Sequence, residues 1–238
     1  MLVEQLSYAD PLSQIIGQGA QRPAETLVSD LTDALKIAKT DPRITGLVLE
    51  LDFLAGGGIS KLKTIGDAIN DFKESDKPVI AIGNNFSQEQ YFLASFADEI
   101  HLNPMGTIVL NGYGNYQPFF KEALDKLKIN FHVFRVGEYK DAVEPFVRND
   151  MSPAAKAQAS LWLNELWQAY SSSVENNRQL PTGSVDHYVH NIAQNLKLAS
   201  GNGAQLALQH GLVDHLSPQP ALRQRLVSMA GLNEKRED

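Results

Sequence analysis

The sequence contains no cysteine, which excludes disulfide bonds, thiolate metal ligands and a cysteine nucleophile. This absence fits the periplasm and the cytoplasm alike, so it does not identify a compartment. No apolar run approaches the roughly 18–20 residues that span a bilayer, and the first ten residues lack a charged segment followed by an apolar one. We therefore expect either a soluble mature protein or an excerpt of a longer protein, separated from its membrane anchor.

Clustered positive charge is also lacking. The chain carries 21 Lys and Arg against 28 Asp and Glu, a net charge of −7, and its basic residues are scattered. Nucleic acid is therefore not an expected partner, because binders of nucleic acid concentrate Lys and Arg on one surface. The 238 residues are 43% apolar, enough to bury a substantial core.

Short apolar segments alternate with segments of helical periodicity in the first 150 residues. The run at 44–51 is leucine-rich and β-branched and is bounded by turn residues, which is typical of a strand buried on both faces. Helices are expected at 23–38, 59–72 and 119–127, and a further one begins after Ser87. Further strands are expected at 77–83, 99–102, 107–110 and 131–136. This alternation predicts an α/β fold with a mostly parallel sheet and covering helices.

Helical patterns dominate after Pro153. A long helix is expected at 154–174, and shorter ones follow to residue 229, with an edge strand or turn at 211–214. We predict a single domain over 1–238, with an α/β core at about 23–150 and a mainly helical extension at about 151–238.

Three consecutive glycines, Gly56, Gly57 and Gly58, stand where the first buried strand leads into a helix. Backbone N–H groups at such a junction can point at an anion or a developing oxyanion. The pattern is not Gly-x-Gly-x-x-Gly, which disfavours a dinucleotide site. The alternative is a tight turn that needs positive φ, and the role of these glycines stays open.

Other candidate groups have simpler interpretations. His187 and His190 could share a helix face, but no carboxylate or third histidine is spaced to complete a metal site with them, so we expect surface residues, no metal and no cofactor. No Gly-x-Ser-x-Gly motif exists, and Ser87 is interpreted as a helix N-cap. The chain therefore offers no obvious nucleophile.

Lys140 is the candidate for acid–base chemistry. It follows an expected strand that ends at Gly137, and aromatic and small residues, among them Tyr139 and Ala142, flank it in the sequence. Burial among apolar groups can lower a lysine pKa from ~10.4 to roughly 7–8, which would make the neutral amine a general base. The alternative is a solvated surface lysine that pairs with Asp141 or Glu144.

The segment Val-Gly-Glu-Tyr-Lys-Asp-Ala-Val-Glu-Pro-Phe at 136–146, with Arg148 and residues 150–155, resembles the lysine segment of the signal peptide peptidase A (protease IV) family. The similarity is to the amino-terminal half of the long bacterial form and covers the chain from about Pro23 onward. Other segments that match in order are 44–51 with 55–57, 87–97 and 165–167.

This resemblance implies a ClpP/crotonase-like fold and a membrane-bound serine peptidase with a Ser-Lys dyad. Lys140 would be the general base from the first half, and a second half of the same protein would carry the serine. The family acts on signal peptides left in the bacterial inner membrane, on its periplasmic face, and assembles as a homotetramer. Expected partners are therefore signal peptides or other apolar peptides, the serine-bearing half and further copies of the protein.

One departure from the family pattern matters. The family's serine follows an Asn-Pro pair, but after Asn103-Pro104 the aligned position here falls near Leu110. We therefore expect the isolated chain to be inactive and regard the glycine run as turn residues rather than oxyanion donors. Two alternatives remain: a catalytically dead scaffold half, and a crotonase-type acyl-CoA enzyme.

Overall fold

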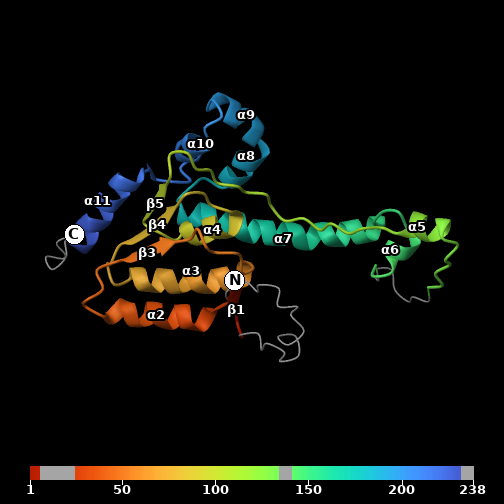
Figure 1. Cartoon of the computed structure of the whole chain (residues 1–238), viewed down its shortest axis with the longest axis horizontal. Coiled ribbons are helices and arrows are strands. Elements are labelled where there is room, and N and C mark those ends of the chain that lie inside the picture. The colour runs from red at the N-terminus through yellow and green to blue at the C-terminus, as the bar shows by residue number, and fades with distance from the viewer. Residues whose placement is uncertain (6–24, 134–140, 232–238) are drawn as a thin grey trace, which may run out of the picture. The chain divides into compact units, whose positions relative to one another are not determined.

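The computed structural model describes residues 1–5, 25–133 and 141–231. The chain packs as two compact units, which are described separately: a first unit of Met1–Asn111 and Tyr170–Asp238, and a second of Gly112–Ala169. The predicted single domain stays a prediction. Figure 1 shows the elements along the chain.

A four-stranded parallel sheet forms the centre of the first unit. Its strands are β3 (Leu47–Glu50), β4 (Val79–Gly83), β5 (Glu99–Leu102) and β6 (His215–Leu216), in that order. The inner strands are buried, and Ile80, Ala81 and Ile100 are each 0% exposed. The α/β class with a parallel sheet is thereby confirmed. A separate pair, β1 (Leu2–Val3) and β2 (Thr26–Leu27), is also parallel.

Helices α2 (Val28–Thr40) and α3 (Ile59–Lys73) pack side by side (Figure 1), and α3 also contacts α4 (Gln88–Ala94). The apolar residues of α3 recur every three or four positions, so they share one face. The buried members are Leu62, Ile65, Ile69 and Phe72. Helix α2 begins at Val28, five residues later than the expected 23.

Three strand predictions need correction. β3 is not buried on both faces, because it lies at the end of the sheet; Val48 is 37% exposed. The expected strand at 107–110 is reduced to a single bridge between Phe86 and Ile108. Phe131–Val133 forms no strand, and the rest of the expected strand at 131–136 lies outside the described residues.

The carboxyl-terminal part of the chain returns to this sheet through α8 (Ser184–His190), α9 (Ile192–Leu198) and α10 (Gly203–Gln209), and α11 (Gln219–Ala230) follows β6. The predicted extension thus supplies a strand to the core. Asp214 fixes this return, because its carboxylate accepts hydrogen bonds from the Ile100 N–H at 2.8 Å and from Arg178 Nη2 at 2.6 Å. Tyr91 Oη donates to the Leu212 carbonyl at 2.7 Å.

The second unit contains α5 (Lys121–Lys126), α6 (Glu144–Val147) and the first part of α7 (Pro153–Asn177). Three aromatic rings pack together in it: Phe131 stacks on Phe146 at 4.8 Å, and Phe120 lies 6.3 Å from Phe146. None of the helices in the described ranges combines the length and apolar character needed to cross a membrane.

Replacing Tyr91 with Phe tests the bond that holds the carboxyl-terminal return. Tyr91 and Leu212 are buried, at 0% and 1% exposed. In Tyr91→Phe the buried Leu212 carbonyl therefore loses the hydroxyl that donates to it. We expect a loss of about 1–3 kcal/mol in the free energy of unfolding, measured by urea denaturation. Tyr116→Phe is the matched control, because Tyr116 is 95% exposed. Equal stability of the two variants would contradict the role given to this bond.

Candidate functional site

Polar side chains follow β3, β4 and β5 at the edge where these parallel strands end. Asn84 takes a central place, because its N–H and its Nδ2 donate to the two carboxylate oxygens of Asp52 at 3.0 and 2.6 Å. Asn103 Nδ2 in turn donates to Asn84 Oδ1 at 3.1 Å. Parallel sheets gather the loops that follow their strands at one edge, where ligands commonly bind. Sequence reasoning used Asn103 only to locate the position of the family's serine, and it did not single out Asp52 or Asn84.

The glycine run lies in the loop between β3 and α3, and its backbone explains the residue type. Gly56 and Gly58 have backbone φ angles of 113° and 72°, which residues other than glycine rarely adopt. A Cβ on Gly57 would lie 2.8 Å from the Leu2 side chain. The carbonyl of Gly56 accepts from the Leu2 N–H at 3.1 Å. These features support the tight-turn interpretation.

Leu110 occupies the position at which the resemblance would place a serine. The residue is 9% exposed and lines a small cavity together with Tyr188 and Leu206. The backbone just before it pairs with Phe86, which accepts from the Val109 N–H at 2.9 Å. Leu110 therefore contributes packing and offers no hydroxyl.

Ser87 is an N-cap, as predicted. Its Oγ accepts from the Gln90 N–H at 3.3 Å, and Gln90 Oε1 accepts from the Ser87 N–H at 2.8 Å. The two bonds form a capping box at the start of α4. Helix capping accounts for this serine without a catalytic role.

Lys140 lies outside the described residues, so its role as general base stays a prediction. The residues that follow it are well anchored. Glu144 is 2% exposed, and its Oε2 accepts from the Ser152 N–H at 2.9 Å. The Asp141 carbonyl accepts from the Glu144 N–H at 2.8 Å. Glu144 thus has a structural function, joining α6 to the residues just before α7.

The candidate pair His187 and His190 makes local contacts. His190 Nδ1 lies 2.8 Å from the Asp186 carbonyl oxygen, and His187 Nδ1 lies 3.2 Å from Asn191 Nδ2. Each bond joins residues four apart on or beside α8, which is typical of a helix surface. These contacts agree with the interpretation of the pair as surface residues.

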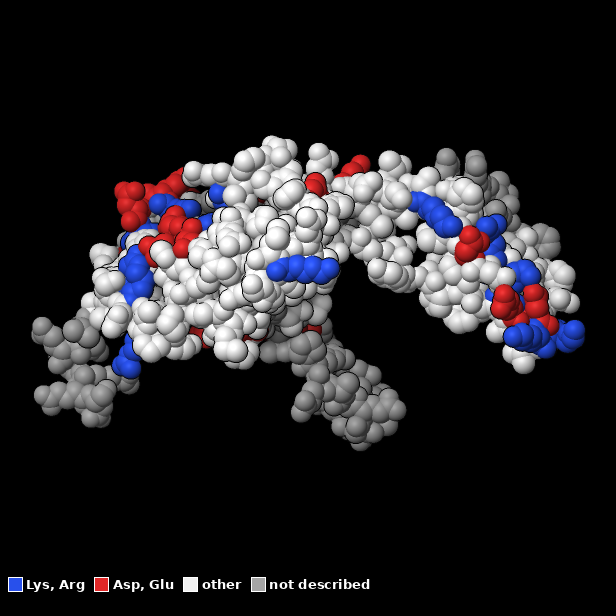
Figure 2. Space-filling model, turned by 90° about the horizontal axis from the view of Figure 1, so that it is seen from above, with Lys and Arg blue, Asp and Glu red and all other residues white. Residues whose placement is uncertain are grey.

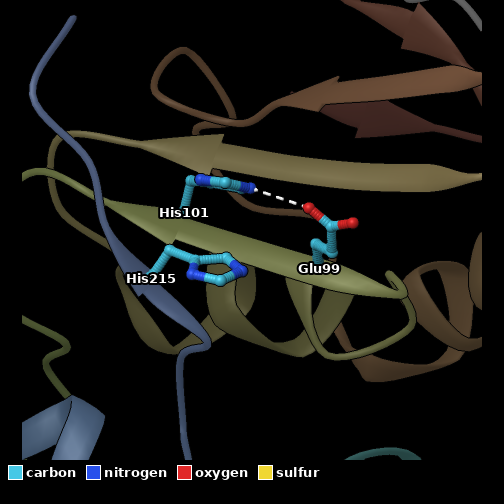
Figure 3. A group of neighbouring side chains, drawn as sticks. All are labelled: Glu99, His101 and His215. Carbon is cyan, nitrogen blue, oxygen red and sulfur yellow. Dashed lines mark hydrogen bonds and ion pairs between the residues drawn. The ribbon is translucent and has the colours of Figure 1, made fainter. Parts of the chain in front are cut away.

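A different group in the described part of the chain has the donors for a metal ion: Glu99, His101 and His215 (Figure 3). The Arg225 guanidinium lowers the pKa of Glu99 to about 2, and burial lowers the pKa of His101 from its usual value. Sequence reasoning missed this group, because His215 joins the others only through β-sheet pairing. The one local signal was the spacing of Glu99 and His101, which places both on one face of a strand.

The family model for Peptidase family S49 matches residues 71–233, more than half of the chain. The chain belongs to peptidase family S49. This matched span includes Leu110 and Lys140, whereas the glycine run lies before it.

Curated relatives agree with the S49 assignment. "Protease 4" of Haemophilus influenzae is 42% identical over 228 residues, covering 96% of this chain and 37% of the relative. "Protease 4" of Salmonella typhi is 42% identical over 218 residues, covering 92% and 35%. The S49 chain therefore spans about a third of the length of these relatives.

Solved structures also align with the S49 chain. "ThnE from S.clavuligerus" has a TM-score of 0.35 at 14% identity, with 85% of this chain and 72% of that one covered. An enoyl-CoA hydratase/isomerase family member has a TM-score of 0.31 at 16% identity, with 77% and 76% covered. Similarities at such TM-scores carry no argument about fold or function.

We expect His210 to make the stability of the first unit depend on pH. Burial, and next the charge of His187, lower the pKa of His210 from its usual value. The folded state therefore prefers the neutral ring, so stability falls as the pH drops below about 6.5, where unfolded histidine binds a proton. In His210→Gln, the loss of unfolding free energy between pH 7.5 and 5.5 should be smaller than in the wild type, by urea denaturation. His190→Gln controls for the loss of one histidine, and an unchanged pH dependence in His210→Gln would refute the prediction.

Proposed function

We propose that this chain is the lysine-donating half of a Ser-Lys endopeptidase that degrades cleaved signal peptides. The observation that carries the proposal is the 136–146 segment, which contains Lys140 and lies within the span matched by the S49 family. The 42% identity to two proteins named Protease 4 supports the peptidase activity. The longer protein would act at the periplasmic face of the bacterial inner membrane.

The proposed mechanism assigns one proton transfer to Lys140. Its neutral amine would remove the proton of a serine hydroxyl as the serine oxygen attacks the peptide carbonyl, and would return that proton to the leaving amine. Such a transfer requires the amine and the hydroxyl to approach within roughly 2.6–3.2 Å. Because Leu110 stands where the family pattern places a serine, the hydroxyl would come from the second half of the longer protein.

The surface of the second unit supports contact with apolar partners. Seven apolar side chains of this unit are 37–69% exposed: Phe120, Leu127, Ile129, Phe131, Phe146, Leu161 and Trp162. Exposed apolar groups in this number favour burial against a partner or an apolar peptide. We propose that they contact peptide substrates or the other subunits of a homo-oligomer, a tetramer as in the family.

The distribution of charged side chains supports the proposal that nucleic acid is not a partner. On the face shown in Figure 2, most Lys and Arg side chains are interspersed with Asp and Glu, and they form no extended block of one sign. Lys39, for example, pairs with both Asp71 and Glu74. An extended basic surface is what nucleic acid would require.

Lys140→Ala in the longer protein tests the base. We expect kcat/KM for a chromogenic peptide ester to fall by about 10²–10⁴-fold, because the serine loses its proton acceptor. Lys126→Ala is the matched control, since Lys126 is an exposed lysine of α5 in the second unit. Undiminished turnover in Lys140→Ala would refute the dyad and favour the scaffold alternative.

The isolated 238-residue chain offers a second test. It should hydrolyse the same ester no faster than buffer, because it supplies the base without the nucleophile. Turnover by the isolated chain that Lys140→Ala abolishes would place a working serine within this chain and contradict the division between halves.

A further inference from the structure

Glu99, His101 and His215 lie on one face of the sheet in the first unit. Glu99 and His101 are two positions apart on β5, so their side chains point to the same side. His215 on β6 is the direct cross-strand partner of His101, which places it on that side as well. Figure 3 shows both imidazole rings extending from their strands toward the Glu99 carboxylate.

The spacing of the donor atoms suits a small divalent ion. His101 Nε2 and Glu99 Oε2 are 3.1 Å apart, and one donor atom from each of the three residues lies within 4.8 Å of the other two. Ligands about 2.0–2.2 Å from a tetrahedral Zn²⁺ lie roughly 3.3 Å from one another. The first two donors already have this spacing. His215 is exposed, so its ring can turn to close the remaining distance.

Neighbouring groups hold two of the three residues in place. His101 Nδ1 lies 2.8 Å from Ser217 Oγ, which can accept a hydrogen bond from Nδ1–H and so leave the Nε2 lone pair for a metal. Arg225 donates to both Glu99 oxygens, at 2.9 Å from Nε and 2.5 Å from Nη2. Metal-binding histidines and carboxylates commonly have such outer hydrogen bonds, which orient them.

We propose that Glu99, His101 and His215 form a binding site for a divalent transition-metal ion of the Zn²⁺ type. Two imidazoles and one carboxylate suit Zn²⁺ better than Ca²⁺ or Mg²⁺, which prefer oxygen ligands. The ion would replace the hydrogen bond between His101 and Glu99. Because it would also join β5 to β6, it would stabilise the pairing that holds the carboxyl-terminal part of the chain.

Calorimetric titration of the full 238-residue chain with ZnCl₂ tests the proposal, with CaCl₂ and MgCl₂ as comparisons. We expect saturable binding of one Zn²⁺ per chain, no comparable binding of the other two ions, and a rise in Tm that EDTA reverses. His215→Gln should raise the Kd for Zn²⁺ at least tenfold. This variant should fold normally, because His215 is an exposed residue.

His187→Gln is the matched control. His187 also has a histidine ring close by, that of His210 at 6.2 Å, and it belongs to a different part of the same unit. Its substitution should leave the Kd unchanged. The proposal is overturned if the wild type shows no saturable Zn²⁺ binding, if His215→Gln binds Zn²⁺ as tightly as the wild type, or if both variants weaken binding equally.

Discussion

Parallel backbone pairing of β5 with β4 on one side and β6 on the other is the interaction on which the first unit depends. It buries the middle of the sheet, where Ile100 and Leu102 are 0% exposed, and satisfies backbone groups that would be costly to leave unpaired there. Since β6 comes from near the end of the chain, this pairing also fixes the last part of the chain to the core. The bonds of Asp214 and Tyr91 strengthen the same connection.

The parallel arrangement also determines where polar chemistry gathers. Strands that run in one direction end at one edge, and the loops after β3, β4 and β5 bring Asp52, Asn84 and Asn103 into a single hydrogen-bonded row. On one face of the sheet, the register of β5 with β6 places His101 beside His215. Neither arrangement follows from local spacing, because each depends on which strands are neighbours.

Local patterns predicted local features well. The three-to-four-residue spacing in α3, the apolar run of β4 and the Ser87 cap all rest on residues close in sequence, and each is present. Two predictions that depended on strand neighbours were wrong. The sequence of β3 is typical of a strand buried on both faces, yet β3 lies at the end of the sheet. Residues 107–110 are apolar enough for a strand, but they make only a single bridge, between Phe86 and Ile108.

The candidate catalytic residues show the same division between local and long-range information. A short motif is enough to single out Lys140, and the family match includes it. Under the proposal the nucleophile lies outside this chain. Leu110 is buried in the core, and the chain spans about a third of the length of its Protease 4 relatives. A complete Ser-Lys site would then be a property of the longer protein, with this chain supplying the base.

A crystal structure of the longer protein would test this account most directly, through the distance from Lys140 Nζ to the nearest serine Oγ. The account predicts a separation of roughly 2.6–3.2 Å, with the serine contributed from outside these 238 residues. A Lys140 amine in bulk solvent, or one whose nearest serine hydroxyl lies within this chain, would contradict it.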